Sequence, residues 1–372
     1  MIWIWLLLQA LTVAGVVNYW RNLPSDRQEA APDGVVAILS VRDNWDGGAD
    51  LIESLKCQSV AFRLILSSSG QCAAAEALAE QEGDWVQLVR AGVASDEGQK
   101  VHKVRAALRA LRDEDSWLVF IDADILPPRR FVGRLLFPLA KGKADLATGY
   151  RMLLPARGAM ASLVGAMEIQ LATLPRSPNA TMPWGGAMAM SRTVADRLDL
   201  DAVLAGRLSD DMAIGLAGWR AKLRLRPVRD LLVATPLDGR AGSLLGFGVR
   251  QYRHILTNSA NMWLVATGAV AVQAAMWIWA IIWGGAAAIA VGYGAGWCRA
   301  LVRRQILRSV LGPDQARSAG RSLIWDVVAP FAVTFAHLTV QLAAARSDRI
   351  LWGGWRYRVR RGRVVAMERV DA

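Results

Sequence analysis

The chain has 372 residues, a formal net charge of +12 and 53% hydrophobic residues. Its mean hydropathy of +0.24 is high for a purely soluble protein. Three cysteines without a CxxC pair or a Cys/His cluster argue against a disulfide framework and a zinc site, and they fit a reducing compartment. The positive charge suits an anionic membrane surface or a phosphate-bearing substrate, and nucleic acid is disfavoured because arginines crowd beside apolar segments. These are Arg299, Arg303, Arg304 and Arg308, then Arg356, Arg358, Arg360, Arg361 and Arg363.

Residues 1–20 are apolar and carry no charge beyond the amino terminus. About 20 apolar residues cross the hydrocarbon core of a bilayer. Arg21 and Arg27 follow the run, and neither a basic start nor a clear cleavage site precedes them, so a signal anchor is favoured over a cleaved signal peptide. This orientation places the following domain in the cytoplasm, and the composition suggests a bacterial inner membrane.

Residues 34–255 alternate between short apolar runs and helix-like stretches, which predicts an α/β domain with a mostly parallel, Rossmann-like sheet. Strands are expected at 34–41, 63–68, 85–89 and 117–122. Ligands of such sheets bind beyond the carboxyl ends of the strands. Candidate site residues are therefore sought just after the strands.

A long apolar stretch at 262–298 exceeds one untilted span, and Gly284-Gly285 is the expected turn between two spans. An Arg-rich loop and a third apolar run at 323–345 follow, and a basic tail at 346–372 ends the chain. Four simple spans would put this tail opposite the catalytic domain, against the positive-inside rule. A re-entrant segment around Pro330 is one resolution, and it stays open at this point.

Asp122 and Asp124 form a D-x-D pair at the exit of the strand that ends near residue 121. Pro127 and Pro128 follow and cannot continue a strand. Mg²⁺ and Mn²⁺ prefer oxygen ligands, usually one or two carboxylates together with phosphate oxygens. The pair therefore predicts a divalent-metal and diphosphate site, with an exposed acidic turn as the alternative.

Asp210 and Asp211 open a helix-like segment. Carboxylates there cap the free N–H groups of a first helical turn, so capping is one interpretation. The functional interpretation is that Asp211 removes the proton of an acceptor hydroxyl, with Asp210 holding it in place or raising its pKa.

Arg250, Arg253 and His254 lie just before the long apolar stretch. Arginines can clamp a diphosphate as it departs, although a juxtamembrane cluster can also contact lipid headgroups. Lys103, beside His102, is expected on a helix before the D-x-D strand and is a further candidate for phosphate contact, with a solvated helix face as the alternative.

Trp184, Gly185 and Gly186 lie between the two acidic sites. The glycines predict a loop that lets the sugar or the acceptor approach the backbone closely. We interpret this segment as an acceptor loop.

The order of these motifs resembles the family-two-type glycosyltransferases with a GT-A fold, and it is most similar to ceramide glucosyltransferases and their bacterial relatives, including hopanoid-associated ones. The similarity covers roughly residues 3–363 and includes the ending ILWGGWRYRVRRG. The resemblance implies an inverting transferase that uses a UDP-sugar, with UDP-glucose favoured, and a divalent metal at Asp122 and Asp124. It also implies general-base work at Asp211 and leaving-group contacts at Arg250 and Arg253.

Two positions depart from the family pattern. His254 stands where the family usually has Trp, and Ser67, Ser68, Ser69 and Gln71 occupy the region of its earliest Asp motif, for which Asp43 is a candidate replacement. The sequence thus predicts transfer of a sugar to a membrane-lipid hydroxyl. A processive polysaccharide synthase and a catalytically inactive lipid-binding relative are the alternatives. The central expectation is that residues 124, 211, 250 and 253 converge on one pocket at the inner surface of the bilayer.

Overall fold

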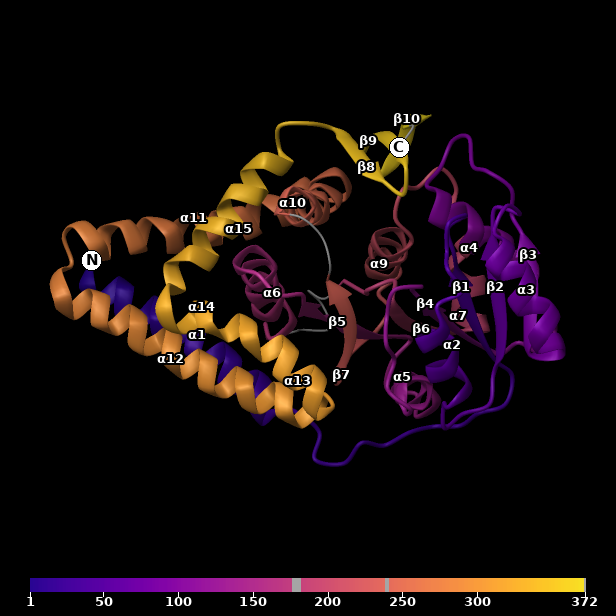
Figure 1. Cartoon of the computed structure of the whole chain (residues 1–372), viewed down its shortest axis with the longest axis horizontal. Coiled ribbons are helices and arrows are strands. Elements are labelled where there is room, and N and C mark those ends of the chain that lie inside the picture. The colour runs from indigo at the N-terminus through magenta and orange to yellow at the C-terminus, as the bar shows by residue number, and fades with distance from the viewer. Residues whose placement is uncertain (176–181, 238–240, 371–372) are drawn as a thin grey trace. The chain divides into compact units, whose positions relative to one another are not determined.

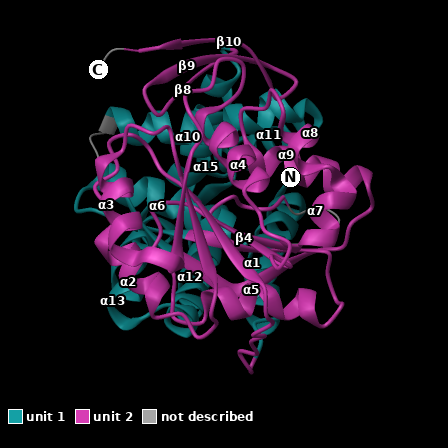
Figure 2. Cartoon of the chain, turned by 90° about the vertical axis from the view of Figure 1, so that its right-hand side faces the viewer, with its two compact units in different colours: residues 1–24, 152–176, 234–347 teal, residues 25–151, 177–233, 348–372 magenta. Residues whose placement is uncertain are grey.

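The structure is a computed structural model that describes residues 1–175, 182–237 and 241–370. The chain forms two compact units, shown in Figure 2. Unit 1 comprises residues 1–24, 152–176 and 234–347, and unit 2 comprises residues 25–151, 177–233 and 348–372. The expected catalytic domain at 34–255 is therefore shared between the units, and the expected basic tail belongs to unit 2.

Unit 2 is built on a seven-stranded sheet with the order β3-β2-β1-β4-β6-β5-β7 (Figure 1). Strands β1, β2, β3 and β4 are parallel, whereas β6 runs antiparallel to both β4 and β5. The strands are β1 (Val35–Ser40), β2 (Arg63–Ser68), β3 (Val86–Arg90), β4 (Trp117–Ile121), β5 (Leu146–Pro155), β6 (Ala187–Ser191) and β7 (Leu225–Leu237). This is the mostly parallel, GT-A-like sheet that the apolar runs predict.

Both faces of the sheet are covered because its strands are apolar on both sides. Along β1, Val35, Ala37 and Leu39 pack into one core, and Val36 and Ile38 pack into the other. The covering helices are α2 (Ala49–Lys56), α3 (Ala73–Glu82), α4 (Gln99–Arg109), α5 (Phe131–Ala140), α7 (Arg192–Leu198), α8 (Leu200–Leu204) and α9 (Asp210–Arg220).

The sheet topology brings several loops to one edge. The carboxyl ends of β1, β2 and β4 meet there because these strands are parallel. The amino end of β6 meets them, since Ile121 pairs with Ala187 in antiparallel register. The D-x-D pair after β4 and the glycines before β6 therefore lie next to each other at this edge of the sheet.

Residues 346–372, expected to be a basic tail, contain a second sheet of three antiparallel strands in unit 2. Its strands are β8 (Arg349–Trp352), β9 (Trp355–Arg360) and β10 (Arg363–Arg369). The side chains of Ile350, Tyr357 and Val359 form a small core with Leu208, and the arginines of β9 are exposed on the other face.

Unit 1 is helical apart from the ends of β5 and β7. Its helices are α1 (Ile2–Arg21), α6 (Ala159–Ala172), α10 (Ala241–Asn258), α11 (Ala260–Ile282), α12 (Gly285–Val310), α13 (Pro313–Gly320), α14 (Ile324–Val328) and α15 (Pro330–Ala344). Helix α1 packs along α12. Trp5 is fully buried there, stacks edge-on against Trp277 at 4.9 Å and donates its indole N–H to Ala288 O at 2.8 Å.

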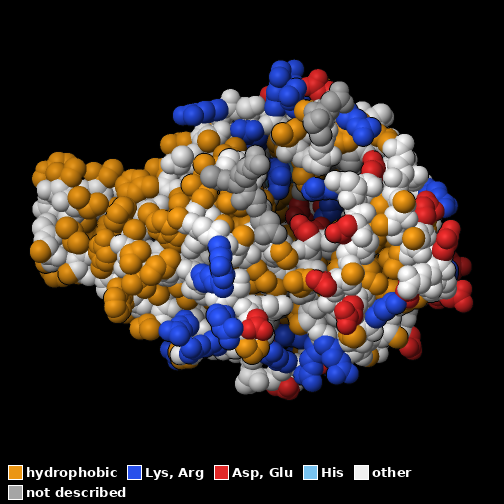
Figure 3. Space-filling model, in the orientation of Figure 1, with side chains coloured by type: hydrophobic (Ala, Val, Ile, Leu, Met, Phe, Trp, Pro, Cys, Tyr) orange, Lys and Arg blue, Asp and Glu red, His pale blue; other side chains and the backbone are white. Residues whose placement is uncertain are grey.

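Three helices within the described residues are long and apolar enough to cross a membrane: α1, α11 and α12. Exposed apolar side chains gather over the end of unit 1 that these helices form (Figure 3). The residues of α13 to α15 pass the same test only as a pair bent by 103° around residue 329, which is either a broken span or a re-entrant loop. A membrane location is therefore plausible on length and composition.

The Arg-rich segment expected as a loop at 299–321 is mostly helical, because α12 continues to Val310. Two of its arginines do not face outward as expected for headgroup contact. Arg299 is buried and donates to Thr12 Oγ1 at 2.8 Å, and Arg303 is buried against Asp326. A buried guanidinium needs such partners because an unpaired buried charge is costly.

Candidate active site

The centre of the candidate site is an acidic cluster with one cation, at the edge of the large sheet where β4 ends. Lys100, in the first turn of α4, extends its ammonium group to Asp122 Oδ1 at 2.7 Å and to Asp210 Oδ2 at 3.0 Å. Burial alone would lower the pKa of Lys100, but the charges of Asp122, Asp210 and Asp211 outweigh it and hold that pKa above its ordinary value. The lysine is therefore a fixed positive charge among three carboxylates.

Lys100 was not among the residues predicted from the sequence, which pointed to Lys103 one turn later. The signal was available, since a first-turn residue of a helix that follows a parallel strand lies nearest the ligand-binding edge. Lys103 Nζ instead donates to Val41 O at 2.7 Å, and burial lowers the pKa of Lys103. His102 contacts Glu97 at 2.7 Å and Ala91 O at 2.9 Å.

Asp211 is held by three donors at the start of α9. Its Oδ1 accepts from the Ser209 hydroxyl and from Met212 N at 2.6 Å, and its Oδ2 accepts from Gly185 N at 3.2 Å. The capping interpretation is thus partly met, because Met212 N is a first-turn N–H group. The carboxylate is nevertheless partly exposed, whereas Asp210 beside it is 2% exposed.

The Gly185-Gly186 segment passes so close to the acids that side chains would not fit. A Cβ at Gly185 would lie 2.8 Å from Lys100 Nζ, and one at Gly186 would lie 2.3 Å from the Trp184 ring and 2.8 Å from Asp122 Oδ2. Trp184 itself is 8% exposed and donates its backbone N–H to Thr148 Oγ1 at 3.0 Å. The glycines are thus required by close approach of the backbone to the acidic cluster.

Asp122 and Asp124 are the candidate ligands of a divalent cation. Asp124 is exposed at the mouth of the site, yet surrounding protein limits its hydration and the nearby Asp122 charge adds repulsion, so the pKa of Asp124 is raised. No cluster of three or more potential ligands occurs within the described residues. Two carboxylates without a third protein ligand suit Mg²⁺ or Mn²⁺, which retain water and take phosphate oxygens.

The loops after β1 and β2 meet at the same edge. The Ser69 hydroxyl contacts Asp43, Ser67 Oγ donates to Lys103 O at 2.9 Å, and Ser68 Oγ accepts from Gly70 N at 3.1 Å. Asp43, the candidate replacement for the family's early Asp, therefore lies directly beside the serines that occupy that region.

Arg250, Arg253 and His254 lie on α10 in unit 1. The Arg250 guanidinium lies 5.4 Å from the centre of the Phe247 ring. Arg253 donates to Ala344 O and Ala343 O, both at 3.1 Å, and so binds carbonyls at the carboxyl end of α15. Burial, followed by the Arg250 charge, lowers the pKa of His254 to about 3, which keeps the imidazole neutral. The expected convergence of the two arginines with the acids of unit 2 stays a prediction.

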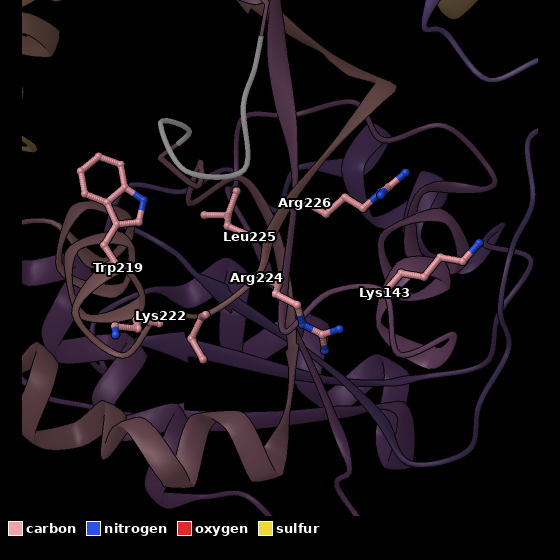
Figure 4. Close-up of a pocket in the computed structure, with 7 residues that line it drawn as sticks. Lys143, Trp219, Lys222, Arg224, Leu225 and Arg226 are labelled. Atoms are coloured by element: carbon pink, nitrogen blue, oxygen red, sulfur yellow. The ribbon is translucent and has the colours of Figure 1, made fainter.

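A concavity of about 580 Å³ lies at the carboxyl end of α9 (Figure 4). The residues that line it are Lys143, Trp219, Lys222, Leu223, Arg224, Leu225 and Arg226. Arg224 is already paired with Asp145 at 3.0 Å. Since α9 has 11 residues, this basic surface lies roughly 15 Å along the helix from the acidic cluster.

The mostly parallel sheet with a D-x-D pair after its fourth strand is the arrangement of GT-A glycosyltransferases. A model of the family described as "Glycosyltransferase like family 2" matches residues 48–236, just over half of the chain. The protein belongs to this family. No curated protein sequence matches the chain.

Several solved structures are similar to this chain at low sequence identity. A mannosyltransferase from Pyrobaculum calidifontis, solved with GDP-Man and Mn²⁺, is 15% identical with a TM-score of 0.50, over 91% of this chain and 97% of that one. S. aureus TarS 1–349 with UDP-GlcNAc is 11% identical with a TM-score of 0.41, over 91% and 99%. Glucosyl-3-phosphoglycerate synthase from Mycobacterium tuberculosis, with Mn²⁺ and UDP-glucose, is 18% identical with a TM-score of 0.38, over 66% and 82%.

Proposed function

We propose that this family-2 glycosyltransferase moves a sugar from a nucleoside diphosphate donor to the hydroxyl group of a membrane lipid, with inversion at the anomeric carbon. One observation carries the proposal: Lys100 lies between Asp122 and Asp210, and Asp211 is oriented beside them, all at the ligand-binding edge of the sheet. The edge thus combines a carboxylate positioned as a base with a cation positioned for a phosphate.

Asp211 acts as the general base in this proposal. Its carboxylate is oriented by Ser209, Met212 and Gly185, and it stays open on one side for an acceptor hydroxyl. The hydroxyl proton passes to Asp211 while the acceptor oxygen bonds to the anomeric carbon and the bond to the diphosphate oxygen breaks. An α-linked donor then gives a β-glycoside.

The departing diphosphate gains negative charge, which positively charged groups stabilise. Lys100 supplies one charge from within unit 2. Arg250 and Arg253 supply two more if α10 approaches the acids, as the motif order predicts. Arg253 is half-buried against the carboxyl end of α15, where it donates to two carbonyl groups, so this role requires its guanidinium to serve both groups or to exchange partners.

Asp122 and Asp124 would hold a divalent cation, Mg²⁺ or Mn²⁺, whose charge would neutralise the donor diphosphate. Burial, followed by the Asp122 charge, raises the pKa of Asp124, and a bound cation would relieve the repulsion between the two carboxylates. The metal site does not identify the base of the donor nucleotide. We propose UDP-glucose as the donor because the motif order resembles that of ceramide glucosyltransferases. Asp43 and Ser69, which follow β1 and β2, are side chains available at the expected nucleoside position, whereas Ser67 and Ser68 are buried in β2.

A lipid acceptor and an anionic membrane surface as partner are supported by α1, α11 and α12, and by the arginines on the outer face of β9. Chain connectivity also constrains topology. The C-terminal sheet and the acids share unit 2, and we therefore assign them to one side of the bilayer in this proposal. If α11 crosses and α12 returns, α13 to α15 must enter and leave on that same side, which is the cytoplasmic side by the positive-inside rule.

Cysteine labelling in intact bacterial cells tests this topology. In a chain whose three cysteines are replaced, Trp283→Cys should react with an impermeant reagent, whereas Gly312→Cys and Gly353→Cys should react only after the cells are opened. Labelling of residues 283 and 353 from the same side would contradict the arrangement.

The activity is tested with the full chain in membranes, by nucleotide release from UDP-glucose and GDP-mannose and by mass spectrometry of the lipids. We expect nucleotide release together with a hexose-sized mass increase on a lipid. Asp211→Asn should abolish both, and Asp196→Asn, at an exposed carboxylate of unit 2, should change neither. A growing polymer would favour the polysaccharide synthase, and absence of release with any donor would favour the inactive relative.

A further inference from the structure

The C-terminal sheet lies outside the family match, which ends at residue 236. Its inner side chains are nevertheless as buried as those of the main core. Tyr357, Ile350 and Val359 are each 1–2% exposed, and they pack against Leu208, which is fully buried. Leu208 stands two residues before Asp210. The small core therefore encloses the segment that leads into the acids.

Residues 206–208 form the middle layer of a three-segment arrangement. On one side, Val364 N donates to Gly206 O at 2.9 Å and Leu208 N donates to Gly362 O at 3.3 Å. On the other side, Gly98 N donates to Arg207 O at 2.8 Å. Paired backbone segments of this kind move as one piece, because shifting one breaks hydrogen bonds to both neighbours.

The third segment, residues 97–99, leads into α4 and Lys100. It is bound to the middle layer by a side chain as well, since buried Glu97 accepts from Gly206 N at 3.1 Å. The approach leaves no space, because a Cβ at Gly98 would lie 2.4 Å from Leu208 O. The residues that precede Lys100 and those that precede Asp210 are thus fixed against each other.

Tyr357 connects the C-terminal sheet directly to the first residue of α4. Its hydroxyl oxygen accepts a hydrogen bond from Gln99 N at 3.3 Å. The first N–H groups of a helix have no partner within the helix, so an external acceptor is needed to fix them. Burial raises the pKa of Tyr357 to about 12, and the group stays a neutral phenol at physiological pH.

We propose that the C-terminal sheet is a positioning element of the catalytic site, and that Tyr357 is a positioning residue that fixes the start of α4 and with it the Lys100 ammonium group between Asp122 and Asp210. The assignment rests on the proposed transferase function. Tyr357 touches neither donor nor acceptor in this account, and it acts only through the backbone of Gln99.

A purely structural sheet would make a different prediction, and two substitutions separate the cases. Tyr357→Phe removes the hydroxyl group and keeps the ring in the small core. Val359→Ala keeps the hydrogen bond and removes packing from the same core, which lowers the melting temperature. Within one cluster, Tyr357→Phe thus tests positioning and Val359→Ala tests stability.

We expect Tyr357→Phe to lower kcat by about 3- to 10-fold, the scale of one lost hydrogen bond, with a melting temperature close to that of the unchanged protein. Val359→Ala should lower the melting temperature by several degrees and keep kcat per folded molecule. Equal kcat for Tyr357→Phe and the unchanged protein would overturn the proposal. The proposal would also be overturned if, in both variants, activity fell only in proportion to the fraction of folded protein.

Backbone hydrogen exchange makes the test independent of the transferase assignment. In the full chain in nanodiscs, the amide of Gln99 should exchange at least about 3-fold faster in Tyr357→Phe than in Val359→Ala. If the unchanged protein transfers no sugar, the proposed function fails, and this comparison still decides whether Tyr357 fixes α4. Equal exchange at Gln99 in the two variants would refute the positioning role.

Discussion

Replacing Lys100 with methionine removes the cation whose ion pairs link the two acidic positions. The change keeps most of the side-chain volume and deletes the ammonium group, which lies 2.7 Å from Asp122 and 3.0 Å from Asp210. Asp210 is 2% exposed, so its carboxylate would be left without its positive partner in a poorly hydrated position. Removing one member of a buried ion pair lowers the free energy of unfolding by about 3–5 kcal/mol.

The pH dependence follows from the direction of the lysine shift. The pKa of Lys100 is raised in the folded protein, so its contribution to stability is complete below the unfolded pKa. That contribution is lost only when the pH rises through the still higher folded pKa. At pH 7 the whole effect is therefore present, and Lys100→Met should show its full deficit at neutral pH.

Thermal unfolding in detergent measures this effect, and a double-mutant cycle assigns it. For a unit of this size we expect Lys100→Met to lower the melting temperature by roughly 6–15 °C. Asp210→Asn added to Lys100→Met should recover part of the loss, since the uncompensated charge is then gone. A Lys100→Met melting temperature within about 2 °C of the unchanged protein would refute the ion-pair argument.

Three further outcomes follow from the structure. Asp211→Asn should lower kcat by about 10²–10⁴-fold with a nearly unchanged donor KM, measured by nucleotide release; a loss confined to KM would exclude the general-base role. Gly186→Ala should lower kcat at least about tenfold because its Cβ would meet the Trp184 ring. A kcat equal to that of the unchanged protein, measured by steady-state kinetics, would contradict the close packing. Arg303→Met should lower the free energy of unfolding by about 3–5 kcal/mol, because Asp326 in unit 1 loses this partner. The control is Arg317→Met, at an exposed arginine, and equal melting temperatures for the two variants would contradict the prediction.

The fold was the most predictable part of the molecule. Apolar runs of strand length at 63–68 and 117–122 coincide with β2 and β4 or extend one residue beyond them, because β-branched and aromatic residues in such runs are typical of buried parallel strands. The family-2 glycosyltransferase assignment and the GT-A fold are confirmed, whereas the relationship to ceramide glucosyltransferases stays a prediction. The helix pair at 262–298 was also predictable, since a long apolar stretch with two central glycines leaves few alternatives.

The contacts within the site were less predictable. Spacing identified Asp122 and Asp210 separately, but nothing in the sequence indicates that one lysine bridges them. The choice between Lys100 and Lys103 depends on which end of α4 faces the ligand edge. Three residues of helix separate the lysine paired with Asp122 from the lysine bound to Val41 O. Composition likewise could not distinguish Arg303, buried against Asp326, from arginines that face solvent.

The C-terminal sheet also bears on how the protein matures. Tyr357 and residues 362–364 follow the apolar helices in the chain, yet they contact the backbone that leads to Lys100 and to Asp210. The nascent chain must therefore complete synthesis of its apolar helices before these final strands can fold onto the catalytic half. A chain cut just before residue 357 would lack the hydrogen bond to Gln99 N and the pairing of residues 362–364 with residues 206–208, so the proposed positioning role predicts a weakened site in it.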